Sequence, residues 1–106
     1  MPTNVQKLLS ELKNELSRIY GKRLKGVYLY GSYARGENQP DSDVDVMIVL
    51  DSWQRYGDEI KRTSELNARL SLDYNVSISR LFMTEDRWKN EDSPLLQNIR
   101  AQGQPA

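Results

Sequence analysis

The sequence predicts an α/β protein in which helices flank a small mixed β-sheet and pack mainly on one side of it. Three patterns support this fold class. Apolar residues recur at helical spacing near the N-terminus, two apolar runs rich in β-forming residues follow, and helix and strand patterns then alternate. The predicted order is α-β-(turn)-β-α-β-α-α. Because the chain has 106 residues, we expect a single domain over residues 1–106.

The first helix is predicted close to the N-terminus. Thr3 and Gln6 stand at the spacing of a capping box, and Gly21 suits the C-terminal stop. One apolar stripe runs along this segment at helical spacing, and it consists of Val5, Leu8, Leu9, Leu12, Leu16, Ile19 and Tyr20. The pattern indicates an amphipathic helix.

Three segments are predicted to be strands, over residues 26–30, 44–50 and 74–82. Each is short and rich in β-forming residues. A brief helical turn over residues 32–35 is expected after the first strand. Both faces of the second strand are apolar beyond Asp45, so we expect a central strand that is covered on both sides.

Three further helices are expected, each with its own boundary signals. Ser, Thr and Asp favour the N-cap, Pro favours the first turn, and Gly favours the stop. The predictions are a helix over residues 53–70 capped by Asp51 or Ser52, a short helix capped by Thr84, and a last helix capped by Ser93, with Pro94 at its first position and Gly103 at its stop. Residues 103–106 are expected to be a frayed tail.

The composition removes several classes of chemistry. The chain has no histidine and no cysteine, which excludes histidine-dependent triads, histidine-ligated zinc and thiolate metal sites. Lys plus Arg and Asp plus Glu number 15 each, so the sequence lacks the basic excess of a protein that grips nucleic acid unaided. No apolar run is long enough for a membrane span. We therefore expect a cytoplasmic protein without direct nucleic-acid or membrane binding.

Asp43 and Asp45 open the second strand and are the first candidate site residues. Side chains at positions i and i+2 of a strand point the same way, roughly 6.5–7 Å apart. Two carboxylates at that spacing can converge on Mg²⁺ or Mn²⁺, which prefer oxygen ligands and substrate phosphates. The alternative is a pair of water-solvated aspartates at the edge of a loop. Their place at the head of a buried strand favours the metal site, because unpaired charges there are unfavourable.

Gly31 and Ser32 follow the first strand and are candidate phosphate-binding residues. A glycine there lets the backbone approach a phosphate closely, and a helical turn that starts there offers free N–H groups. Ser32 adds a hydroxyl donor. A Gly-Ser pair alone is also the ordinary end of a strand, so the prediction depends on its combination with the aspartates.

The combined stretch GSYARGENQPDSDVDVMIVL, residues 31–50, resembles the minimal nucleotidyltransferase (MNT) family of the DNA-polymerase-β-like nucleotidyltransferase superfamily. The carrying features are Gly-Ser after one strand, a ten-residue gap, and Asp-x-Asp on the next strand. The segment from Tyr33 to Gly36 and the serine Ser42 are also typical of that family. The resemblance implies a polymerase-β-like nucleotidyltransferase fold, small and mixed in its sheet.

The resemblance also implies roles for the individual residues. Gly31 and Ser32 would hold the β- and γ-phosphates of a nucleoside triphosphate such as ATP, with Ser42 as a weaker nucleotide-binding candidate. Asp43 and Asp45 would bind Mg²⁺, or Mn²⁺, and act as the catalytic pair. Arg35 would either support the phosphates or brace the loop.

The superfamily usually supplies a third acid from a later strand, and this sequence departs from that pattern. Ser77 or Ser79 stands where the acid is expected, and neither side chain is ionisable. Asp73 lies just before this strand and is a candidate metal ligand, or else a capping or solvated residue. The site is therefore expected to be one carboxylate short.

Small members of the family are typically antitoxins paired with a HEPN ribonuclease toxin. The resemblance therefore implies an MntA-type antitoxin that forms a hetero-oligomer with such a toxin and transfers AMP from ATP to a toxin tyrosine. Two alternatives stay open. The chain could mask the toxin by binding alone, with weak or absent catalysis, or it could modify RNA or a small molecule.

Overall fold

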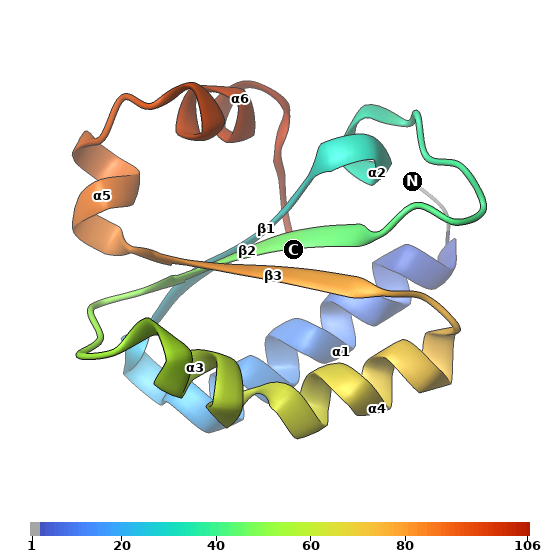
Figure 1. Cartoon of the computed structure of the whole chain (residues 1–106), viewed down its shortest axis with the longest axis horizontal. Helices are drawn as coiled ribbons and strands as arrows, with labels where there is room; N and C mark the ends of the chain where they lie inside the picture. Colours follow the sequence, from blue (N-terminus) through green and yellow to red (C-terminus); the bar gives the residue numbers. More distant parts are fainter. Residues whose placement is uncertain (1–2) are drawn as a thin grey trace.

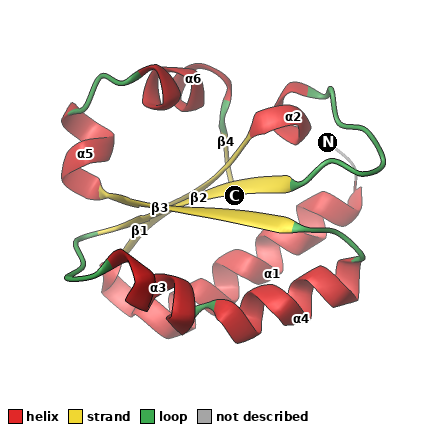
Figure 2. Cartoon of the chain, in the orientation of Figure 1, coloured by secondary structure: helices red, strands yellow, loops and turns green. Residues whose placement is uncertain are grey.

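The computed structural model describes residues 3–106, which form a four-stranded mixed sheet with helices on both faces (Figure 1; Figure 2). The strand order is β3-β2-β1-β4. The elements in chain order are α1 (Thr3–Tyr20), a 3₁₀ turn (Gly21–Arg23), β1 (Leu24–Tyr30), α2 (Gly31–Arg35), β2 (Val44–Leu50), α3 (Tyr56–Arg62), α4 (Ser64–Tyr74), β3 (Ile78–Thr84), α5 (Glu85–Asn90), α6 (Pro94–Gln102) and β4 (Gln104–Pro105). The small mixed sheet predicted from the sequence is confirmed.

Strand β2 is the centre of the sheet, as predicted. It pairs antiparallel with β1 and parallel with β3. Six of its seven residues are buried, and Asp45 is the exception. The prediction for residues 44–50 is correct because a continuous apolar run needs cover on both faces.

Strand β3 begins at Ile78, later than the predicted start at residue 74. Helix α4 continues through Tyr74 and ends at Asn75, which adopts a left-handed conformation with φ 52°. Asparagine tolerates this conformation better than most residues, so it can end a helix as glycine does. The β-forming residues before Ile78 therefore belong to a helix end and a connection.

The predicted helix over residues 53–70 is two helices, α3 and α4, which are divided at Thr63. The Thr63 side chain is buried, where its hydroxyl lies 3.0 Å from the Glu59 carbonyl oxygen and accepts from Arg80 Nη1 at 2.6 Å. The predicted capping by Asp51 or Ser52 is wrong, because Arg55 precedes α3. The Asp51 carboxylate instead accepts from Arg23 Nε at 3.2 Å. The spacing of the apolar residues alone could not reveal the division at Thr63, because it depends on the contact of Thr63 with Arg80 of β3.

Two hydrophobic layers lie on opposite faces of the sheet. Helices α1, α3 and α4 cover one face, and α5 and α6 cover the other (Figure 1). The expectation that helices lie mainly on one side therefore needs correction. The second layer is smaller, and its buried residues are Met47, Val49, Met83, Leu96 and Ile99.

The boundaries of the last two helices are confirmed. The Thr84 hydroxyl accepts from Arg87 N at 3.3 Å, and the Ser93 hydroxyl accepts from Leu96 N at 3.3 Å.

In α1, Ile19 is 38% exposed although it fits the apolar stripe. The side chain of Thr3 lies outside the part of the chain that the structure describes, so the capping box stays a prediction.

The C-terminal residues are paired with the sheet, so the prediction of a frayed tail is wrong. Gln104 pairs with Leu29, and Ala106 N donates to Val27 O at 2.9 Å. Gly103 makes the sharp connection possible, because a Cβ there would lie 2.4 Å from the Ile99 carbonyl oxygen. Within residues 3–106, no helix is long and apolar enough to cross a membrane.

Candidate active site

The Gly-Ser turn and the aspartate pair meet at one end of the sheet. Tyr30, the last residue of β1, pairs with Asp45 of β2, and Gly31 follows it with φ +75°. A Cβ on Gly31 would lie 2.2 Å from Asp45 Oδ2. Only glycine permits both the backbone conformation and this close approach. The turn therefore packs directly against the carboxylate that we predict to bind metal.

Helix α2 is a single short turn that the surrounding chain holds in place. Its own residue Tyr33 is buried, and Glu37 N donates to Ser32 O at 2.9 Å. Gln104 Nε2 donates to the Ala34 carbonyl oxygen at 2.9 Å, which links the turn to β4. This network fixes the position of Ser32 relative to Asp45.

Asp43 and Asp45 lie close enough for the charge of one to act on the other. Asp45 is partly buried, whereas Asp43 is exposed one residue before β2. Burial raises the pKa of the Asp45 carboxyl, the negative charge of Asp43 raises it further, and the charge of Arg35 opposes both effects. A divalent cation between the two carboxylates would remove their mutual repulsion.

Arg35 and Ser42 brace the loop that joins α2 to β2. Arg35 Nε forms an ion pair with Glu37 Oε2 at 3.0 Å, while its charge also acts on Asp45. The Ser42 hydroxyl accepts from Gln39 N at 2.8 Å. These contacts hold the loop in its conformation. A direct role of either side chain in nucleotide binding stays a prediction.

Of the two serines predicted to stand in place of a third acid, only Ser79 lies within β3. It pairs with Asp45 across the parallel β2–β3 ladder, whereas Ser77 precedes β3 and accepts from Val44 N through its carbonyl oxygen. Asp73 lies on α4, where Arg69 Nη1 is 3.8 Å from its carboxylate. Residues 3–106 contain no group of three or more acidic or histidine side chains that could hold a metal. The structure therefore does not bring Asp73 to the pair.

Two carboxylates are nevertheless a suitable donor set for Mg²⁺. This ion is commonly bound through one or two carboxylates, with waters and substrate phosphates in its other positions. The close approach of Gly31 to Asp45 leaves backbone rather than a side chain beside the carboxylate. The residues present thus fit a magnesium ion that is shared with a phosphate group.

Helix α6 adds residues to this end of the molecule that the sequence analysis did not single out. A cavity of about 210 Å³ lies between Gly31 and Arg35 on one side and Leu95, Asn98 and Gln102 on the other. The last three residues follow i, i+3, i+7 spacing, so they share one helix face. That spacing is visible in the sequence, but only the fold places this face beside Gly31.

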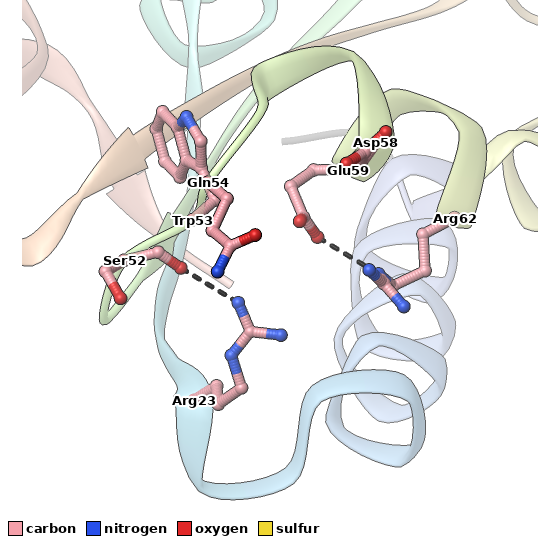
Figure 3. A pocket seen from close by; sticks show the side chains of 7 residues that line it. All are labelled: Arg23, Ser52, Trp53, Gln54, Asp58, Glu59 and Arg62. Carbon is pink, nitrogen blue, oxygen red and sulfur yellow. Dashed lines mark hydrogen bonds and ion pairs between the residues drawn. The ribbon is translucent and has the colours of Figure 1, made fainter.

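A second cavity, of about 380 Å³, lies at the opposite end of β2, roughly 20 Å away at the rise of an extended strand. Figure 3 shows that the polar groups lining it contact one another. Arg23 Nη2 donates to Ser52 O at 2.8 Å, and Arg62 Nε lies 3.2 Å from Glu59 Oε1. The same Glu59 atom accepts from the Tyr20 hydroxyl at 2.8 Å. We interpret this end as a structural ion-pair network.

Replacing Glu59 with alanine is expected to destabilise the fold without touching the candidate active site. Glu59 is 3% exposed, and its loss leaves the buried Tyr20 hydroxyl without its partner. An unsatisfied buried donor costs about 1–3 kcal/mol, so the urea midpoint should fall. Asp58→Ala, which changes an exposed neighbour, is the matched control. Equal urea midpoints for the two variants would contradict the structural role of Glu59.

The fold and the site together define an enzyme of the nucleotidyltransferase class. The turn predicted to bind phosphate and the carboxylate pair lie together at one end of a mixed sheet, as such chemistry requires. Residues 9–95 match the nucleotidyltransferase domain family, and the chain belongs to this family. The nucleotidyltransferase assignment predicted from residues 31–50 is therefore confirmed.

Two relatives from Methanocaldococcus jannaschii have names that place them among the protein adenylyltransferases. MJ0604 is 34% identical over 83 residues, which are 78% of this chain and 77% of that protein. MJ0141 is 35% identical over 72 residues, which are 68% of this chain and 72% of that protein. The similarity thus extends well beyond the motif.

Solved structures share the fold at lower identity. A minimal nucleotidyltransferase aligns with a TM-score of 0.67 and 17% identity, over 96% of this chain and 92% of that one. A chain of a toxin–antitoxin complex with AMP-PNP aligns with a TM-score of 0.61 and 20% identity, over 90% and 69%. A chain of the complex between tri-AMPylated Shewanella oneidensis HEPN toxin and MNT antitoxin aligns with a TM-score of 0.61 and 17% identity. The alignment covers 94% of this chain and 69% of that one. These alignments confirm the predicted fold.

Proposed function

We propose that this chain is an antitoxin that transfers AMP from ATP to a tyrosine hydroxyl of a HEPN-type toxin. The close approach of Gly31 to Asp45 carries the proposal, because it brings the turn that we predict to bind phosphate beside the carboxylate pair that we predict to bind metal. The protein adenylyltransferase names of the relatives support a protein acceptor. The toxin–antitoxin complexes among the structural neighbours support a toxin as that acceptor.

The residues of the site have distinct tasks in this reaction. The Gly31 and Ser32 backbone and the Ser32 hydroxyl would bind the β- and γ-phosphates, and Asp43 and Asp45 would hold Mg²⁺. A bound Mg²⁺ supplies charge neutralisation and a lower pKa for the acceptor hydroxyl. A bond forms between the acceptor oxygen and the α-phosphorus, the bond to the β-phosphate oxygen breaks, pyrophosphate leaves, and the hydroxyl proton passes to solvent.

AMP attached to the toxin would inhibit its ribonuclease activity through charge. A phosphodiester near the nuclease site adds negative charge where RNA phosphates must bind. Like charges then repel the RNA substrate. The net charge of zero on the present chain is consistent with a protein acceptor, because this chain need not attract nucleic acid itself.

The proposal is tested by incubating the chain with its partner toxin, Mg²⁺ and ATP labelled at the α-phosphate. We expect label on the toxin, its absence when Mg²⁺ is chelated, and its loss when the acceptor tyrosine is changed to phenylalanine. An unlabelled toxin that is still neutralised without ATP would favour masking by binding. Label that enters tRNA or a small hydroxyl compound, and not the toxin, would favour the third function.

Introducing an acid at Ser79 is expected to strengthen metal binding. Ser79 pairs with Asp45, so Ser79→Asp would bring a third carboxylate beside the pair. We expect Mg²⁺ affinity to rise several-fold, because each added charged oxygen ligand strengthens a hard-cation site. Calorimetric titration with Mg²⁺ measures the change, with Ser77→Asp as a control outside the strand. Equal affinities in wild type and Ser79→Asp would contradict the placement of Ser79.

A further inference from the structure

Helix α6 is tied to the preceding segment and to β4 over the sheet face that carries Asp45. Arg100 Nη2 donates to the carbonyl oxygens of Trp88 and, at 2.7 Å, of Glu91. The connection after the helix is set by Gly103 and by the pairing of β4 with β1. Leu96 and Ile99 pack the helix onto the sheet. Its position beside the candidate active site is thus determined by the fold.

The face of α6 turned toward Gly31 carries Leu95, Asn98 and Gln102. Leu95 is 44% exposed, and Asn98 and Gln102 follow it on the same face. Within residues 3–106, no hydrogen bond engages either of these two side-chain amides, whereas the amide of the neighbouring Gln97 donates to Asp92 Oδ1 at 2.9 Å. One apolar surface and two free amides therefore line the cavity beside the Gly-Ser turn.

The size and position of this cavity suit part of a nucleotide. Its volume of about 210 Å³ is below the roughly 300–1,000 Å³ of sites that enclose a whole small ligand. Gly31 and Arg35 line it, so it is continuous with the predicted phosphate site. Tyr30 adds an aromatic wall on the sheet side.

We infer that this cavity receives the base of the bound nucleoside triphosphate and that Asn98 and Gln102 select adenine. This inference rests on the proposed function, because it takes the phosphates to lie at Gly31 and Ser32. An amide offers one donor and one acceptor side by side, which match the adenine N6 amino group and a neighbouring ring nitrogen. The Leu95 side chain and the Tyr30 ring supply the apolar surfaces that a base requires.

The test measures nucleotide binding by equilibrium dialysis with Mg²⁺ and no acceptor. The wild-type chain should bind ATP more tightly than CTP. In the variant Asn98→Ala with Gln102→Ala, the ATP dissociation constant should rise about 10-fold, which is the loss of two hydrogen bonds, and CTP binding should change little. Gln97→Ala, on the same helix but facing Asp92, should bind ATP as the wild type does. Both altered amides are exposed, so the variant should remain folded.

The other outcomes separate this inference from the proposed function. If the double variant binds ATP as tightly as the wild type, the inference is overturned while the proposed function stands. Unchanged ATP binding together with a raised KM for the acceptor protein would assign the cavity to the acceptor instead. If the wild-type chain binds no nucleoside triphosphate, both the inference and the proposed function fail.

Discussion

Replacing Asp43 and Asp45 together with asparagine is expected to abolish nucleotidyl transfer while leaving the fold intact. Loss of both carboxylates would remove the proposed donors for Mg²⁺, an ion whose charge stabilisation contributes several kcal/mol to such reactions. A reduction of at least about 10³-fold in the transfer rate follows from a barrier change of that size. The rate of label transfer from α-labelled ATP to the partner measures the effect.

Asp41→Asn is the matched control for this pair. Asp41 is an exposed carboxylate in the same loop, two residues before Asp43, and it has no part in the predicted site. We expect its transfer rate to equal that of the wild type. Undiminished transfer by the Asp43→Asn, Asp45→Asn protein would remove the carboxylate pair from the mechanism.

The single change Asp45→Asn should also make the protein more stable at neutral pH. Burial and the charge of Asp43 raise the pKa of Asp45 in the folded state, so the folded protein holds the proton more tightly than the unfolded chain does. Ionisation of Asp45 therefore reduces stability as the pH rises through that pKa, and the penalty is complete once the folded carboxyl has ionised. Asparagine removes the charge, so the urea midpoint should rise at pH 7.

That stability gain should disappear in acid, where the wild-type carboxyl is protonated. Urea titrations at pH 7 and near pH 3 test the sign of the effect. A midpoint for Asp45→Asn that falls below the wild type at pH 7 would mean that the ionised carboxylate is stabilising. An inactive but more stable variant would show that the site keeps an unfavourable charge for its chemistry.

The parts of the fold that sequence predicted well are those with local causes. The apolar run of β2 required cover on both sides, and the hydroxyls of Thr84 and Ser93 cap helices whatever lies around them. The parts that it missed depend on distant contacts. Thr63 breaks a helix because it meets Arg80 from β3, and the C-terminal residues form β4 because β1 has an open edge.

The residues of the candidate site also differ in whether a local pattern or a distant contact brings them to the site. Asp43, Asp45, Gly31 and Ser32 are predicted from their combined motif and its family resemblance, and the structure places Gly31 against Asp45. The two serines predicted to replace a third acid are visible in the sequence, and the structure pairs Ser79 with Asp45. The cavity on α6 could not be predicted, because no local pattern states which face of a C-terminal helix turns toward Gly31.

Replacing Gly31 with alanine is expected to damage both stability and catalysis. The residue has φ +75°, and an added Cβ would lie 2.2 Å from Asp45 Oδ2. A left-handed alanine is unfavourable by about 1–2 kcal/mol, and the steric conflict adds about 1–3 kcal/mol. Denaturant unfolding measures the loss of stability. Transfer should fall even where the protein remains folded, because the turn or the carboxylate must move.

Gly36→Ala separates the two causes. Gly36 also has a left-handed φ, +71°, but a Cβ there meets no atom within 4 Å. Its loss of stability should therefore reflect the backbone term alone, and transfer should persist. Combining Gly31→Ala with Asp45→Ala removes the clashing carboxylate, so the double variant should be more stable than the sum of the single effects predicts. Strict additivity would contradict the direct packing of Gly31 on Asp45. A double variant that is more stable than additivity predicts would demonstrate that Gly31 is required because the Asp45 carboxylate lies against it. This contact physically links the Gly-Ser turn to the aspartate pair.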